Sequence, residues 1–99
     1  MAKILMLIGD NFEDTEGIAT LDVLIRGKNI VTLASVMKRK EITTKLGLKV
    51  LIDTLVEDIN PLDYDALVIP GGPGSFTILD KLNIVNELIY TFYQNNKLV

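Results

Sequence analysis

Apolar residues along this chain gather in three short runs, separated by longer stretches of mixed polarity. Each run is four or five residues long, and they lie at Ile4–Ile8, Ile30–Ala34 and Ala66–Ile69. Short, nearly continuous apolar runs are typical of strands buried on both faces of a sheet. A further strand is expected to open at Lys97-Leu98-Val99, so we expect the chain to stop as that strand begins.

The stretches between these runs carry apolar residues at helical spacing. One predicted helix lies between the first two runs, and Gly27 is placed to end it in a left-handed conformation. The inner stripe of this helix is predicted to be Ile18, Leu21, Leu24 and Ile25. A short helix is predicted from Ser75, followed by a longer one over Leu82–Tyr93. The inner stripe of the longer helix is predicted to be Ile84, Leu88 and Phe92.

The middle of the chain follows a different pattern. Residues Glu41–Ile52 alternate loosely between apolar and polar, with Gly47 at a turn or bulge, which indicates one or two peripheral strands of antiparallel character. Residues Asp58–Asp63 are predicted to form a loop or a single turn. Strands that alternate with helices imply an α/β fold, a flavodoxin-like parallel sheet sandwiched by helices. We expect residues 1–99 to belong to a single domain of this kind.

Composition narrows the chemistry that this chain can perform. The chain has 99 residues, a net charge of -3, no cysteine and no histidine. It therefore contains no thiol metal site and no Cys–His or Ser–His pair, and we expect no metal or cofactor. Acidity argues against nucleic acid, so the basic run Lys38–Lys40 is interpreted as a solvated loop. Ile4–Ile8 is too short for a membrane span, and the expected location is cytoplasmic.

Four carboxylates follow the first strand, at the edge of the sheet where α/β proteins bind their ligands. They are Asp10, Glu13, Asp14 and Glu16. Acidic side chains at a helix N-terminus are stabilised by the macrodipole, which accounts for Glu13 and Asp14. Either Asp10 or Asn11 is predicted to cap the helix. Glu16 lies deeper, beside a glycine, and is the functional candidate of the four.

The second loop at this edge follows the strand Ala66–Ile69 and contains Gly71 and Gly72. It lacks the Lys-Ser/Thr of a phosphate-binding P-loop and the glycine spacing of a dinucleotide fold. Backbone N–H groups of glycines can approach a ligand closely, so the loop could form an oxyanion hole. A simple tight turn is the alternative, because glycine and proline mark turns in most proteins.

Together these residues resemble the ThiJ/PfpI superfamily, which has the class I glutamine amidotransferase-like fold. Phe12-Glu13-Asp14-Thr15-Glu16 is similar to the start of that family's first helix, and Gly71-Gly72-Pro73-Gly74 is similar to its oxyanion turn. The similarity covers essentially the whole chain. It is greatest to the branch that contains the Parkinson-disease-associated protein deglycase.

The resemblance implies roles for three residues of this chain. Glu16 corresponds to the glutamate that hydrogen-bonds the nucleophilic cysteine, and Gly72, with Gly71 beside it, corresponds to the oxyanion donor. The cysteine itself is expected a few residues past Val99, with a histidine further on. The 99 residues alone are therefore expected to be inactive until joined by the remaining, C-terminal half of the domain.

The family's activities suggest the substrate and the partners of the complete protein. The resemblance implies glyoxalase or deglycase chemistry on small carbonyl compounds or glycated proteins, or a redox-stress role, in a homodimer. A protease activity is disfavoured, because Ser75-Phe76-Thr77 stands where protease-like members carry an additional acid.

Three alternatives remain open on the sequence alone. A class I glutamine amidotransferase domain also has a Gly-Gly-Pro-Gly-Ser turn. A phospho-receiver domain would place an acid where Ile69-Pro70 stands instead. A non-catalytic binding or chaperone module could dimerise through the Ile18–Ile25 helix.

Overall fold

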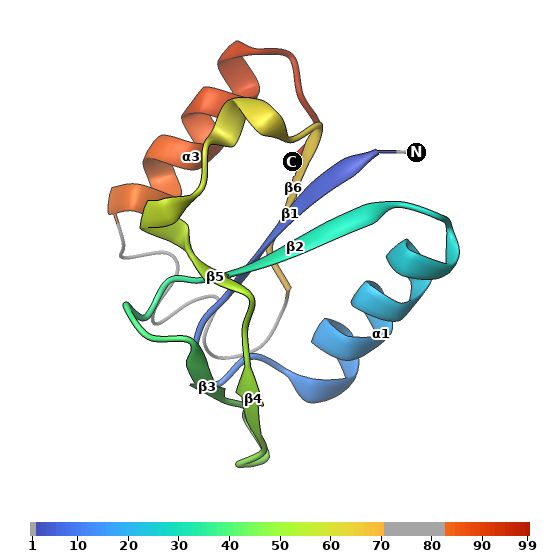
Figure 1. The fold of residues 1–99 in the computed structure, drawn as a ribbon, viewed down its shortest axis with the longest axis vertical. Helices are drawn as coiled ribbons and strands as arrows, with labels where there is room; N and C mark the ends of the chain where they lie inside the picture. Colours follow the sequence, from blue (N-terminus) through green and yellow to red (C-terminus); the bar gives the residue numbers. More distant parts are fainter. Residues whose placement is uncertain (1, 71–82) are drawn as a thin grey trace.

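The computed structural model describes residues 2–70 and 83–99 (Figure 1). The main sheet has four parallel strands in the order β5-β2-β1-β6. These strands are β1 (Lys3–Ile8), β2 (Ile30–Ser35), β5 (Thr54–Leu55) and β6 (Ala66–Val68). The two described α-helices are α1 (Asp14–Arg26) and α3 (Asn83–Gln94). All three strands predicted from apolar runs are confirmed, whereas the two-residue β5 was not predicted.

Strand β1 lies at the centre of the sheet because it pairs on both sides. Ile4 is in register with Val31 of β2 and with Ala66 of β6. On the far side of β6, Leu98 forms a parallel bridge with Ala66, and its carbonyl accepts the N–H of Leu67 at 2.9 Å. Leu98 therefore extends the sheet by one position, as the predicted start of a further strand requires.

The two faces of the sheet carry separate cores, because successive side chains of a strand point in opposite directions. Met6 and Ile8 of β1 point to the face that packs beside α1. Leu5 and Leu7 point to the opposite face, which packs against α3. Figure 1 shows the two helices on opposite sides of the sheet. The predicted α/β architecture, a parallel sheet with helices on both faces, is thus confirmed.

The predicted inner stripe of α1 is only half right. Leu21 and Leu24 are half-buried, but Ile18 is 47% exposed and Ile25 is 54% exposed. The one buried residue of this helix is Gly17. The reason is that Phe12 and the strand-to-strand segment 42–52 supply much of the apolar cover on this face, so α1 lies against the sheet mainly through its middle and its first turn.

The end of α1 also differs from the prediction. Gly27 has φ -74°, an ordinary right-handed value, and its N–H donates to the carbonyl of Val23. Lys28 takes the left-handed conformation instead, with φ +65°. The helix thus ends at Arg26, but the left-handed residue follows one position later than predicted.

A small antiparallel hairpin stands beside the main sheet, as predicted for the middle of the chain. Its strands are β3 (Glu41–Thr43) and β4 (Lys49–Leu51), and Gly47 has φ +89° in the turn between them. The segment predicted as a loop or single turn forms two short 3-10 helices, η1 (Val56–Asp58) and η2 (Pro61–Asp63). Among the described helices, none combines the length and the apolar composition needed to cross a membrane.

Candidate active site

The candidate site lies at the carboxyl ends of β1 and β6. These two strands are neighbours, yet the chain continues from β1 to α1 on one face, while α3, which follows β6, packs on the other. Ligands of open α/β sheets bind in the crevice at such a point of reversal. Gly71 and Gly72 follow β6 but lie outside the described residues, so their predicted oxyanion role stays a prediction.

Asp10 does not cap α1, and that prediction is wrong. Its carboxylate accepts the N–H of Thr43 in β3 at 3.1 Å and forms an ion pair with Arg39. Asn11 does not cap the helix either. It takes a left-handed conformation with φ +66°, which turns the chain from β1 toward α1. Both residues thus shape the loop rather than the start of the helix.

The N-cap of α1 is Glu13. Its side chain accepts the N–H of Glu16 at 2.7 Å, satisfying one of the backbone donors that every helix leaves free at its start. Asp14, in the first turn, accepts the N–H of Leu46 at 3.2 Å. Three of the four carboxylates in this loop therefore serve to hold the loop and the helix start in place.

Glu16 is the exception. Its side chain is exposed, and its carboxylate accepts no hydrogen bond from any residue in the described ranges. Its backbone is nevertheless fixed, because its N–H donates to Glu13. A carboxylate on a fixed helix turn beside a strand end, with no hydrogen-bond partner among the described residues, can bind a group from elsewhere.

Phe12 and Gly17 lock the loop onto the helix. Phe12 is buried, and its ring lies so close to Gly17 that a Cβ on Gly17 would come within 2.5 Å of the ring. Only a glycine allows this approach. The contact holds the residue next to Glu16 against the core.

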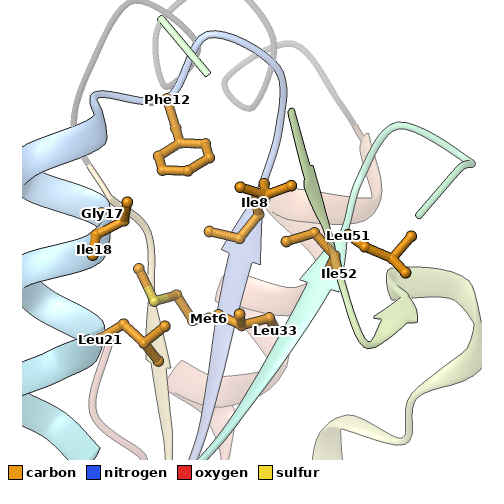
Figure 2. A pocket seen from close by; sticks show the side chains of 10 residues that line it. Met6, Ile8, Phe12, Gly17, Ile18, Leu21, Leu33, Leu51 and Ile52 are labelled. Atoms are coloured by element: carbon orange, nitrogen blue, oxygen red, sulfur yellow. The ribbon is translucent and has the colours of Figure 1, made fainter. Parts of the chain in front are cut away.

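A hollow with a volume of about 110 Å³ opens beneath the Phe12 ring. Figure 2 shows it between α1, the strands β1 and β2, and the hairpin, with Met6 and Leu33 at its base. The side chains that line it are apolar, so it offers no donor that could activate a carbonyl group. The hollow is therefore separate from the chemistry expected at Glu16.

Arg39 and Thr43 are the neighbours of the site that sequence reasoning missed. The run Lys38–Lys40 was interpreted as a solvated loop, and all three side chains are exposed, but Arg39 also forms an ion pair with Asp10. No local pattern could reveal this pair, because Asp10 and Arg39 are 29 positions apart. Among the residues that the structure describes, no group of three or more acidic side chains could hold a metal ion.

The comparisons with known proteins identify a family for this chain. Residues 2–99 match the DJ-1/PfpI family. YraA of Bacillus subtilis, a candidate cysteine protease, is 39% identical over 95 residues, which cover 96% of this chain and 56% of the relative. A deglycase of Pyrococcus abyssi is 43% identical over 70 residues, which cover 71% of this chain and 42% of the relative.

A solved structure agrees in fold. Toxoplasma gondii DJ-1, in an oxidised form, superposes with a TM-score of 0.91 at 24% identity, over 99% of this chain and 53% of that one. This chain thus spans about half the length of the proteins it matches. The family match over residues 2–99 and the fold lead to one conclusion: this chain belongs to the DJ-1/PfpI family.

Proposed function

We propose that this chain supplies the glutamate and the glycine turn of a cysteine-dependent site that acts on small carbonyl compounds or on their adducts with proteins. The observation that carries the proposal is Glu16. It stands at the crevice with its backbone fixed and its carboxylate free of the described residues, while the other three acids of the loop are held in structural bonds. The relationship to a deglycase supports the substrate class.

The register of the sheet indicates where a cysteine shortly after residue 99 would lie. Leu98 bridges Ala66, which is itself in register with Ile4 of β1. From that level β1 runs on to Ile8, at the edge where the crevice lies. A strand continued from Leu98 would reach the same edge after about four residues, since each residue advances about 3.3 Å. A side chain there would lie near Glu16.

The proposed chemistry combines the cysteine, the glycine turn and Glu16. A thiol becomes a nucleophile when its pKa is lowered, as happens at a helix N-terminus. Its thiolate would attack the carbonyl carbon, forming a C–S bond while the carbonyl electron pair moves onto oxygen. N–H groups of Gly71 and Gly72 would stabilise that oxyanion, and the Glu16 carboxyl group would hydrogen-bond the sulfur and hold it in place.

The test replaces Glu16 by Gln in the complete protein. We expect the pH midpoint of thiol alkylation by iodoacetamide to shift, and turnover of methylglyoxal to fall by about 10²-fold, the lower end for losing an acid–base group. Glu57→Gln is the matched control, because Glu57 is an exposed glutamate in η1, on the α3 side of the molecule. Alkylation profiles and turnover equal to those of the control would remove Glu16 from the mechanism.

The same protein also distinguishes the rival activities. Hydrolysis of glutamine, with no turnover of methylglyoxal, would support an amidotransferase. Cleavage of a peptide would support the protease activity that the name of YraA suggests. If the unmodified protein shows neither turnover of carbonyl compounds nor thiol reactivity, the result would support a non-catalytic binding module.

We further propose that the protein is a cytoplasmic homodimer. Ile18 and Ile25 lie one above the other on α1 and remain 47% and 54% exposed. Exposed apolar side chains grouped on one helix mark an interaction surface. The location follows from the chemistry, because a reactive thiol persists in a reducing compartment.

A further inference from the structure

The loop that leads to Glu16 is bonded to the β3–β4 hairpin along its backbone. The N–H of Asn11 donates to the carbonyl of Thr43 at 2.9 Å, and the N–H of Lys45 donates to the carbonyl of Phe12 at 3.0 Å. These bonds join segments more than thirty positions apart in the sequence. The hairpin, which looked peripheral in the sequence, therefore forms one wall of the loop.

Asp10 secures the same junction through its side chain. One carboxylate oxygen accepts the N–H of Thr43 and the other pairs with Arg39, so both oxygens bind the segment that carries the hairpin. The Asp10 side chain is 21% exposed, whereas Asp22, in the other described ion pair, is 56% exposed. Partial burial strengthens an ion pair, while exposed pairs contribute little.

Between Asp10 and Glu16 the loop has little freedom to move. Phe12 packs on Gly17, and Glu13 holds the N–H of Glu16. Because both contacts connect the loop to the first helix turn, a shift at Asp10 is transmitted to Glu16. A catalytic carboxylate must be held within about 0.5 Å of its working geometry.

We propose that Asp10 is a positioning residue for Glu16, and that it acts by clamping the loop to Thr43 and Arg39. This inference rests on the proposed role of Glu16. It predicts that removing the Asp10 carboxylate changes the reactivity of the thiol, although Asp10 itself touches neither the thiol nor the substrate. The amide of asparagine can still accept the N–H of Thr43, so Asp10→Asn should retain much of the clamp.

The test compares three variants of the complete protein. We expect Asp10→Ala to shift the pH midpoint of iodoacetamide alkylation in the same direction as Glu16→Gln, and to lower kcat for methylglyoxal about tenfold or more with little change in KM. Asp10→Asn should recover most of both losses. Asp22→Ala removes the acid of the other described ion pair, with Arg26 on α1, and should leave midpoint and kcat within about twofold.

If Asp10→Ala fails to fold, the variant Arg39→Gln provides a second test of the proposal. It leaves the bond from Thr43 to Asp10 intact and removes only the ion pair, which Asp10→Asn also loses, so its effect should be no larger than that of Asp10→Asn. A fully active Arg39→Gln together with an Asp10→Asn variant as impaired as Glu16→Gln would overturn the clamp. If Asp10→Ala has the same pH midpoint and kcat as Asp22→Ala while Glu16→Gln is impaired, the role of Asp10 is refuted but the proposed function is not. If Glu16→Gln is unchanged, the proposed function fails with it.

Discussion

The two faces of the sheet are covered in opposite ways. On one face, α3 buries Val85, Leu88 and Phe92, and Phe92 is completely enclosed. On the other face, α1 buries Gly17 alone and leaves Ile18 and Ile25 in solvent. The α3 face is thus a closed core, whereas the α1 face relies on a loop residue and on the hairpin for cover.

The two faces therefore contribute differently: the α3 face mainly stabilises the fold, and the α1 face carries the proposed site. The α3 face holds large apolar side chains that pack into one cluster, as a core that resists unfolding requires. The α1 face combines the hollow, the carboxylate of Glu16, which no described residue hydrogen-bonds, and exposed apolar side chains within one helix and its loop. Substitutions on the two faces should therefore have different consequences, which three experiments can measure.

The largest effect on stability is expected at Phe92. Replacing this enclosed ring by alanine should lower the free energy of unfolding by about 3–5 kcal/mol, because it removes apolar contacts and leaves a cavity. Tyr93→Ala is the matched control, since Tyr93 is the next residue of α3 and is 74% exposed. Urea unfolding of the complete protein measures both. Equal losses for the two variants would show that the α3 face is not the closed core described above.

An intermediate effect is expected at Gly17. Alanine usually stabilises a helix by about 1 kcal/mol relative to glycine. Here the added methyl group would meet the Phe12 ring at 2.5 Å, so we expect a net loss of about 1–3 kcal/mol from overpacking. Gly27→Ala is the control, because the nearest atom to its Cβ lies at 3.3 Å and its φ is -74°.

The double variant Phe12→Leu/Gly17→Ala tests whether the Phe12 ring causes this loss of stability. The smaller side chain leaves room for the methyl group, so the combined loss should be less than the sum of the two single losses. A Gly17→Ala variant as stable as Gly27→Ala would mean that the ring moves aside freely, and the lock between loop and helix would be refuted.

The smallest effect on the fold is expected at Ile25. An aspartate there should change the free energy of unfolding of the monomer by no more than about 0.5 kcal/mol, as is usual at exposed positions. It should nevertheless weaken the dimer at least about tenfold, because it places a charge in an apolar contact. Sedimentation velocity measures the dissociation constant, with Leu62→Asp as the control for an exposed leucine of η2. Equal dissociation constants for the two variants would show that the proposed dimer interface does not include Ile25.

The elements of this fold follow from local sequence patterns. The central strand was predicted from an apolar run, because burial on both faces requires one, and α3 from its spacing of Leu88 and Phe92. The identity of the helix cap was not predicted. Glu13 caps α1 because it directly precedes the helix, whereas Asp10, the more usual residue type for that role, lies earlier in the loop and is bound to Arg39 and Thr43.

The parts of the site that were not predicted depend on long-range contacts. Thr43 and Arg39 reach Asp10 across 33 and 29 positions, and a pattern read within one helix or strand contains no information about such pairs. The exposure of Ile18 has the same origin, because Phe12 from outside the helix takes the place that its stripe was expected to fill. The roles of Gly71 and Gly72 stay predictions.

The central position of β1 has a consequence for the order in which the protein is made. Strand β1 and its partner β2 leave the ribosome early, together with α1, whereas α3 begins only at Asn83. At about 5–20 residues/s, the face of β1 that carries Leu5 and Leu7 waits about 4–17 s between the synthesis of Ile8 and that of Gln94, where its covering helix ends. Of the two described faces, the one that α3 covers is therefore closed later than the one that α1 covers, and it is the surface that a nascent-chain chaperone would meet.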